Sequence, residues 1–172
     1  MSATTLQPEG RAWVFGDSID TDLLAPGHAM RKPIEQLAKH CLEAVSPSFA
    51  SSVQRGDVLV AGDGFGIGSS REQAVEALLQ LGIRAVLAKS VARIFYRNAL
   101  NLGLPIVRFA DAGNITNMDR LQIDLSASRV RNLSTGKEYS HEPIPTFLLE
   151  MLTDGGLLPH LHRRLHPAAT QA

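Results

Sequence analysis

Residues 57–80 read DVLVAGDGFGIGSSREQAVEALLQ. The apolar run at residues 57–61 predicts a buried strand, and residues 71–81 have the spacing of an amphipathic helix. Between them, glycines alternate with other residues before Ser69, Ser70 and Arg71. Glycine allows positive φ and a close approach of the main chain to another group. The strand, loop and helix therefore predict an α/β fold in which this loop binds an anion.

The three residues after the last glycine suit a carboxylate or a phosphate. A helix N-terminus offers unpaired N–H groups and the positive end of the helix dipole, and two hydroxyls and a guanidinium add donors. The structural alternative is that Ser70 simply caps the helix, with Arg71 and Glu72 solvated. That alternative explains one serine but not four spaced glycines. The loop is not a P-loop, and it lacks the acidic residue of the dinucleotide fingerprint.

Further strands and helices are expected on both sides of this unit. The sequence predicts strands at residues 11–15, 84–88 and 104–109, and helices at residues 33–45, 91–102, 146–153 and up to about 165. Short antiparallel strands are expected at residues 121–125, 129–133 and 138–140, where apolar and polar residues alternate. We therefore expect one α/β domain over residues 1–172, with a mixed, partly parallel central sheet flanked by helices. Its ordered core spans about residues 10–165, and the tail is expected to be disordered.

Composition excludes several classes of function. Lys plus Arg equals Asp plus Glu at 17 each, which disfavours non-specific nucleic-acid binding and a polybasic membrane role. No apolar run approaches a membrane span, and the first residues lack a signal-peptide pattern. The single cysteine, Cys41, lies in the apolar stripe of residues 33–45 and is expected in the core. It cannot form an intrachain disulfide or a self-sufficient iron–sulfur site. The simplest expectation is a cytoplasmic protein.

Two further groups of polar residues are ambiguous. Asp20 and Asp22 flank Thr21 in a predicted loop, where they can form Asx turns or orient a neighbouring cation. The six histidines are scattered without the spacing of metal ligands, so no metal site is expected. All of them except His28 are expected to be exposed.

Three blocks of sequence, in this order, carry a resemblance to a known family. They are residues 15–22 with Pro26 and Gly27, residues 64–72, and residues 93–105. Over roughly residues 10–165 the chain resembles the small subunit of isopropylmalate isomerase (3-isopropylmalate dehydratase), which is equivalent to the swivelling domain of aconitases. The resemblance implies a swivelling β/β/α domain and a hydro-lyase of leucine biosynthesis. Such an enzyme removes water from a small hydroxy dicarboxylic acid and adds it back at the neighbouring carbon, which isomerises 2-isopropylmalate and 3-isopropylmalate.

The same resemblance implies roles for the polar residues. Ser69 matches the serine that removes the C–H proton as an alkoxide, while Ser70 and Arg71 match residues that bind the substrate carboxylate. Asp22 matches an aspartate near the active site, and Gly66 and Gly68 shape the loop. The physical argument agrees, because serine ionises only in a strongly positive site, which the guanidinium and the helix N-terminus supply.

The loop at residues 26–33 matches the one that selects the substrate in this family. Members that accept an additional carboxylate tend to place an arginine there, and members that accept an isopropyl group often have apolar residues. This loop contains both, since Arg31 follows Met30 and His28, so we expect Arg31 to bind substrate and the other two to influence selectivity. The loop is shorter than in many relatives, and Gln73 stands where many have histidine. A related hydratase therefore stays open, such as homoaconitase or a citramalate, methylmaleate or dimethylmaleate hydratase.

The resemblance also implies a partner. In the family a [4Fe–4S] cluster on a large subunit binds the substrate, which fits the shortage of cysteines here. We expect no cofactor on this chain and a heterodimer or heterotetramer with the cluster-bearing large subunit, without nucleic-acid or membrane partners. A non-catalytic anion-binding module is a further alternative, which the intact Ser69-Ser70-Arg71 disfavours.

Overall fold

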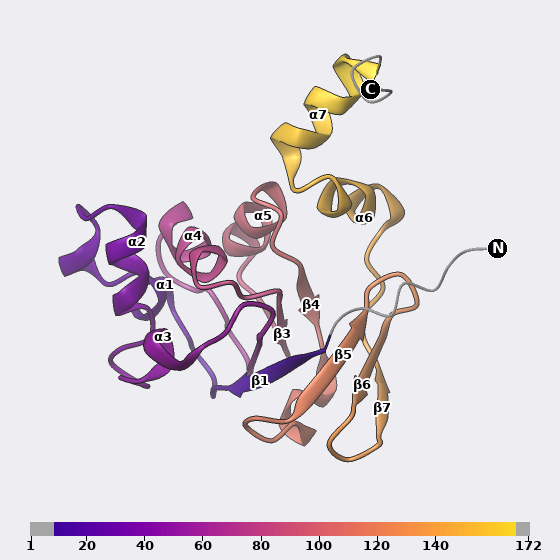
Figure 1. Cartoon of the computed structure of the whole chain (residues 1–172), viewed down its shortest axis with the longest axis horizontal. Coiled ribbons are helices and arrows are strands. Elements are labelled where there is room, and N and C mark those ends of the chain that lie inside the picture. Colours follow the sequence, from indigo (N-terminus) through magenta and orange to yellow (C-terminus); the bar gives the residue numbers. More distant parts are fainter. Residues whose placement is uncertain (1–8, 168–172) are drawn as a thin grey trace.

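A seven-stranded mixed sheet forms the centre of the computed structural model, which describes residues 9–167 (Figure 1). Its strand order is β4-β3-β2-β1-β5-β6-β7. The parallel half comprises β1 (Gly10–Val14), β2 (Val58–Ala61), β3 (Ala85–Ala88) and β4 (Ile106–Arg108). The antiparallel half comprises β5 (Arg120–Asp124), β6 (Arg129–Asn132) and β7 (Glu138–Ser140). Strand β1 joins the halves, because it pairs parallel with β2 and antiparallel with β5. The predicted mixed sheet is confirmed.

Helices follow the parallel strands and the hairpins. The longer ones are α4 (Glu72–Gln80), α5 (Arg93–Asn101), α6 (Thr146–Thr153) and α7 (Leu157–Leu165). The short ones are α1 (Thr21–Leu24), α2 (Ile34–Leu37) and α3 (Phe49–Ser52), with 3-10 turns η1 (Gly27–Ala29), η2 (Ala38–His40) and η3 (Ala110–Asn114). In Figure 1, α1 to α3 gather at one end of the molecule and α7 extends from the other helices. No helix among the described residues is long and apolar enough to cross a membrane.

The central strands are buried on both faces. In β2, Leu59 belongs to the core cluster that also contains Val75 and Leu78 of α4. Its neighbour Val60 belongs to a second cluster that also contains Leu121 of β5. Successive side chains of a strand point to opposite faces, so one continuous apolar run serves both cores.

The prediction of one helix over residues 33–45 is wrong beyond residue 40, because α2 continues only as the 3-10 turn η2. The chain leaves helical geometry at Cys41, whose ψ is 123°, and Leu42 adopts a φ of 60°. The Leu42 N–H donates to the main-chain oxygen of Leu23 at 2.8 Å, and Val45 is 50% exposed. A tertiary anchor thus outweighs local helix propensity. The prediction that Cys41 lies in the core is confirmed, and burial raises the pKa of its thiol.

The prediction that every histidine except His28 is exposed is also wrong. His141 is 6% exposed, and its ring nitrogens contact the main-chain oxygens of Glu142 and Asp124. His40 and His160 are half-buried. Asp124 lies 17 residues before His141, on β5, so sequence periodicity gave no sign that His141 is buried. The expected disordered tail lies, from residue 168 onward, outside the described residues.

Asp57 fastens β1 to the start of β2. Its carboxylate accepts hydrogen bonds from the Arg11 guanidinium at 2.7 Å, the Trp13 indole at 2.9 Å and the Gln54 N–H at 2.9 Å. Burial by itself raises the pKa of Asp57, but the hydrogen bonds, led by those of Arg11, outweigh it and hold the pKa below the ordinary value. The ionised carboxylate therefore stabilises the pairing of the two strands.

We expect Asp57→Ala to lower the free energy of unfolding by about 1–3 kcal/mol, since it leaves the buried indole N–H of Trp13 without its acceptor and removes the carboxylate from the Arg11 guanidinium, which keeps its hydrogen bond to Ser52 O. Urea unfolding measures this change. The exposed Glu35→Ala is the control and is expected to stay within about 0.5 kcal/mol of the parent. Because folding lowers the pKa of Asp57, its stabilisation is present above about pH 3.9 and is lost as the pH falls through the lower folded pKa. An equal loss in both variants would contradict the assignment.

Candidate active site

The glycine loop is held between two neighbouring segments at the carboxyl end of the parallel strands. On one side, Gly66 N–H donates to Ile19 O at 2.7 Å, and Thr21 N–H donates to Ile67 O at 2.9 Å. On the other side, Phe65 N–H donates to Ser90 O at 3.1 Å. The loop is therefore bonded to the segments that follow β1 and β3. In open α/β sheets, ligands bind outside this end of the strands.

Two positions in this loop require glycine. Gly66 has a φ of 76°, and a Cβ atom there would lie 2.3 Å from Cγ of Phe95. Gly68 has a φ of 116°, and its Cβ atom would lie 2.8 Å from Oγ1 of Thr21. Both combine a left-handed conformation with a close approach, as the sequence predicted. The two glycines bring Ser69 to the end of the loop against α1.

Thr21 positions Ser69. The Ser69 N–H donates to Oγ1 of Thr21 at 3.1 Å, and the two hydroxyl oxygens are 3.2 Å apart. Thr21 is 2% exposed, whereas Ser69 is exposed. Sequence reasoning assigned no role to Thr21, although its place between two aspartates was the available signal. Of these aspartates, Asp20 caps α1 by accepting from the Leu23 N–H at 2.8 Å.

Arg71 joins the start of α4 to α1. Its Nη1 atom donates to Oδ1 of Asp22 and, at 3.1 Å, to the main-chain oxygen of Ala25. The Nε–Nη2 edge of the guanidinium has no protein acceptor within residues 9–167. That edge can donate two parallel hydrogen bonds to a carboxylate. Asp22 therefore orients the guanidinium, and one edge is left for a ligand.

The alternative in which Ser70 caps α4 is wrong. Arg71 occupies the N-cap position, and among residues 9–167 there is no side-chain capping hydrogen bond there. Ser70 instead presents its main-chain oxygen to Nδ2 of Asn98 at 3.3 Å. The first N–H groups of α4 are thus not satisfied by a side-chain cap, and they remain donors for an anion.

A concavity of about 360 Å³ lies at this helix start. Its lining residues are Ser69, Ser70, Arg71, Glu72, Gln73 and Glu76. All of them come from the end of the glycine loop and the first turns of α4, so this chain supplies only one wall. The structure thus brings together the predicted catalytic serine and the predicted carboxylate-binding residues.

The loop at residues 26–33 does not line this concavity. His28 contacts Glu43, Met30 packs against the core, and Arg31 is exposed. Their predicted roles in substrate binding and selectivity stay predictions. Cys41 is fully buried and offers no ligand for an iron–sulfur cluster.

We expect Gly66→Ala to destabilise the protein more than Gly136→Ala, which is a matched control. Both glycines have a φ near 75°, but nothing lies within 4 Å of a Cβ atom at Gly136. The left-handed conformation costs about 1–2 kcal/mol at each position. The clash with Phe95 adds about 1–3 kcal/mol at Gly66 alone. Urea unfolding of both variants measures the difference, and equal losses would refute the close fit.

Comparisons of this chain with known proteins all point to one family. The family model of the aconitase C-terminal domain matches residues 26–112. The 3-isopropylmalate dehydratase small subunit 1 of Thermotoga maritima is 49% identical over 156 residues, which cover 90% of this chain and 94% of that protein. The methanogen homoaconitase small subunit of Methanothermobacter thermautotrophicus is 48% identical over 155 residues, 88% of each chain.

A solved structure agrees with the predicted fold class. The crystal structure of 3-isopropylmalate dehydratase from Methanocaldococcus jannaschii matches with a TM-score of 0.88 and 41% identity, covering 95% of this chain and 98% of that one. The chain therefore belongs to the family of 3-isopropylmalate dehydratase small subunits, within the aconitase C-terminal domain superfamily.

Proposed function

We propose that this chain is the small subunit of a hydro-lyase that isomerises 2-isopropylmalate and 3-isopropylmalate, and that it acts only with a large subunit. The observation that carries the proposal is the placement of Ser69, Ser70 and Arg71 on one concavity at the start of α4. The 3-isopropylmalate dehydratase small subunit 1 of Thermotoga maritima, at 49% identity, supports the same reaction.

In this proposal Ser69 is the base. In its alkoxide form the exposed Ser69 oxygen takes the proton from the carbon next to the hydroxyl-bearing carbon and a carbon–carbon double bond forms. The hydroxyl leaves with its bonding electrons and takes up a proton from solvent to become water. Water then adds in the opposite orientation and the proton returns, which gives the isomer. Thr21 Oγ1, at 3.2 Å, can donate a hydrogen bond to the Ser69 alkoxide. The guanidinium of Arg71 and the start of α4 favour the same negative charge.

Arg71 holds a substrate carboxylate in this proposal. The edge of its guanidinium that faces Asp22 is fixed, and the Nε–Nη2 edge is presented to the ligand. Two parallel N–H donors match the two oxygens of a carboxylate, which sets the orientation of the substrate as well as its affinity. Ser70 and the N–H groups of α4 add donors beside it.

The cluster expected in this family does not fit the residues of this chain. A [4Fe–4S] cluster needs several thiolates, and the single cysteine is buried with a raised pKa. We therefore assign the cluster to the large subunit, which would complete the open concavity in a heterodimer or heterotetramer. A cytoplasmic location, where thiolate ligands stay reduced, suits such a partner.

A second candidate is a homoaconitase-type hydratase. It is favoured by the exposed Arg31 in the loop at residues 26–33 and by the similarity to the methanogen homoaconitase small subunit. The test is co-expression with the large subunit, followed by assays on isopropylmalate, homocitrate, citramalate and dimethylmalate. The highest kcat/KM on isopropylmalate supports the main proposal, and the highest value on homocitrate supports the second.

We expect Ser69→Ala to lower kcat of the reconstituted complex at least about 100-fold, since proton transfer by a positioned group contributes this much or more. Gel filtration should show that the variant assembles with the large subunit as the parent does. Ser51→Ala is the control, because Ser51 is an exposed serine whose hydroxyl donates to the main-chain oxygen of Ser48 and which does not line the concavity. Substantial turnover by Ser69→Ala would remove Ser69 from the role of base.

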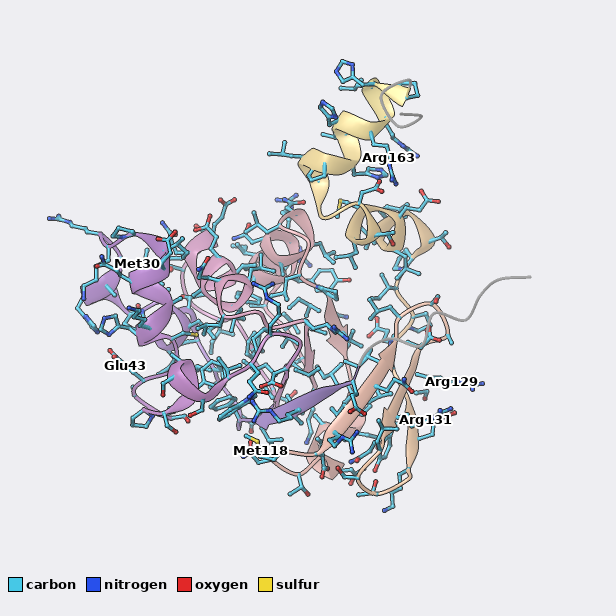
Figure 2. The ribbon with its side chains drawn as sticks, viewed as in Figure 1. Met30, Glu43, Met118, Arg129, Arg131 and Arg163 are labelled. Carbon is cyan, nitrogen blue, oxygen red and sulfur yellow. The ribbon has the colours of Figure 1, made fainter. Side chains whose placement is uncertain are left out.

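We expect Arg71→Lys to raise KM about tenfold or more, because a two-pronged donor becomes a point charge and the contact with Asp22 changes. Steady-state kinetics on the reconstituted complex measures it. Arg129→Lys is the control, since Arg129 lies on β6, far from α4 (Figure 2). An unchanged KM in Arg71→Lys would show that Arg71 does not bind the carboxylate.

A further inference from the structure

Three side chains that the proposed reaction does not use converge at the end of the molecule formed by α1 to α3. They are His28 of η1, His40 of η2 and Glu43, which follows η2. Their possible ligand atoms all lie within 4.8 Å of one another. None of the three lines the concavity at α4. Figure 2 shows Glu43 and Met30 at this end, opposite the hairpin that carries Arg129.

Glu43 bridges the two imidazoles. Its Oε1 atom is 2.6 Å from Nε2 of His28, and its Oε2 atom is 2.7 Å from Nδ1 of His40. The rings meet edge to face with centroids 4.9 Å apart. Hydrogen bonds from His40 and His28 hold the pKa of Glu43 below its ordinary value. The carboxylate is therefore ionised, and a cation can take the place of the protons that the rings donate to it.

The main chain fixes these three residues before any ion binds. His28 lies in a 3-10 turn in which the Ala29 N–H donates to Pro26 O at 2.9 Å. The Glu43 N–H donates to His40 O at 3.2 Å, after Leu42 has reversed the chain in the left-handed region. Ligands held on such turns lose little conformational freedom on binding.

Lys32 contacts the ring nitrogen of His40 that faces away from Glu43. Its ammonium lies 3.1 Å from Nε2 of His40 and can only donate, so Nε2 accepts and Nδ1 carries the proton toward Glu43. When Nδ1 binds a metal, the proton moves to Nε2, and the exposed Lys32 side chain turns away into solvent.

We propose that His28, His40 and Glu43 form a binding site for a divalent transition-metal ion of the Zn²⁺ class, which fastens the loop at residues 26–33 to the turn at residues 40–43. Two imidazole nitrogens and one carboxylate oxygen are a donor set that Zn²⁺ accepts, with water in the fourth position. The same set disfavours Mg²⁺ and Ca²⁺, which prefer oxygen ligands. Because His28 is the ligand from the loop, an occupied site restrains the segment that carries Arg31.

A second pair of histidines must be disrupted by substitution before Zn²⁺ binding is measured. His162 and His166 lie four residues apart at the end of α7, and their ring centroids are 4.9 Å apart. Such a pair can hold Zn²⁺ on its own. The parent for the test is therefore His162→Ala, which leaves the three-residue site intact. Cys41 does not compete, because it is fully buried.

The test is calorimetric titration of Zn²⁺ into the metal-free full chain carrying His162→Ala, at pH 7.5. We expect one site, which His28→Ala and Glu43→Gln each weaken at least about tenfold. Glu35→Gln, an exposed carboxylate on α2, is the matched control and should bind as the parent does. Mg²⁺ should give no binding heat. The proposal is overturned if the parent binds no Zn²⁺, or if His28→Ala binds it as tightly as the parent.

A second measurement guards against variants that fold poorly. An ion that binds only the folded state raises the midpoint of thermal unfolding. We expect Zn²⁺ to raise the midpoint of the His162→Ala parent and to leave that of the His28→Ala variant unchanged. Equal increases in both would overturn the proposal.

Discussion

The close fit of the glycine loop against its neighbours is the constraint on which the candidate site depends. A single Cβ atom at Gly66 would collide with Phe95, so the loop can reach its position only without a side chain there. From that position the loop bonds to the segments that follow β1 and β3. This arrangement places Thr21 beside Ser69 and Asp22 beside Arg71. The chemistry of the site thus depends on a packing requirement in the loop, to which the hydrogen bonds between the loop, α1 and the start of α4 are added.

Arg71 shows how the site divides between structure and ligand. One edge of the guanidinium contacts Asp22 and the Ala25 oxygen, which holds the start of α4 against α1. The opposite edge meets no protein acceptor within residues 9–167, and Arg71 lines the same concavity as Ser69. The concavity also lacks a second wall, which is the property expected of a site completed by another chain.

The sequence predicted the central sheet and the glycine loop because both depend on local pattern. The apolar run at residues 57–61 is continuous because Leu59 and Val60 pack into different cores. Such a run can be recognised in the sequence without the structure. The helix at residues 33–45 failed for the opposite reason. The apolar spacing of this segment indicates which of its residues are buried. The Leu42 N–H, however, donates to the main-chain oxygen of Leu23, and the chain turns there instead of continuing as a helix. Thr21 was missed because its partner, Ser69, is 48 residues away.

The segment between α1 and Glu43 supports both of the sites described above. It supplies Asp22 to Arg71 at one end, and Glu43 to the two imidazoles at the other. The hydrogen bond from the Leu42 N–H to Leu23 O, at 2.8 Å, joins the turn before Glu43 to the helix that carries Asp22. Packed elements of this kind move as units rather than deforming continuously. An ion at His28, His40 and Glu43 would therefore act on the candidate active site through α1, by limiting the positions open to the partner of Arg71.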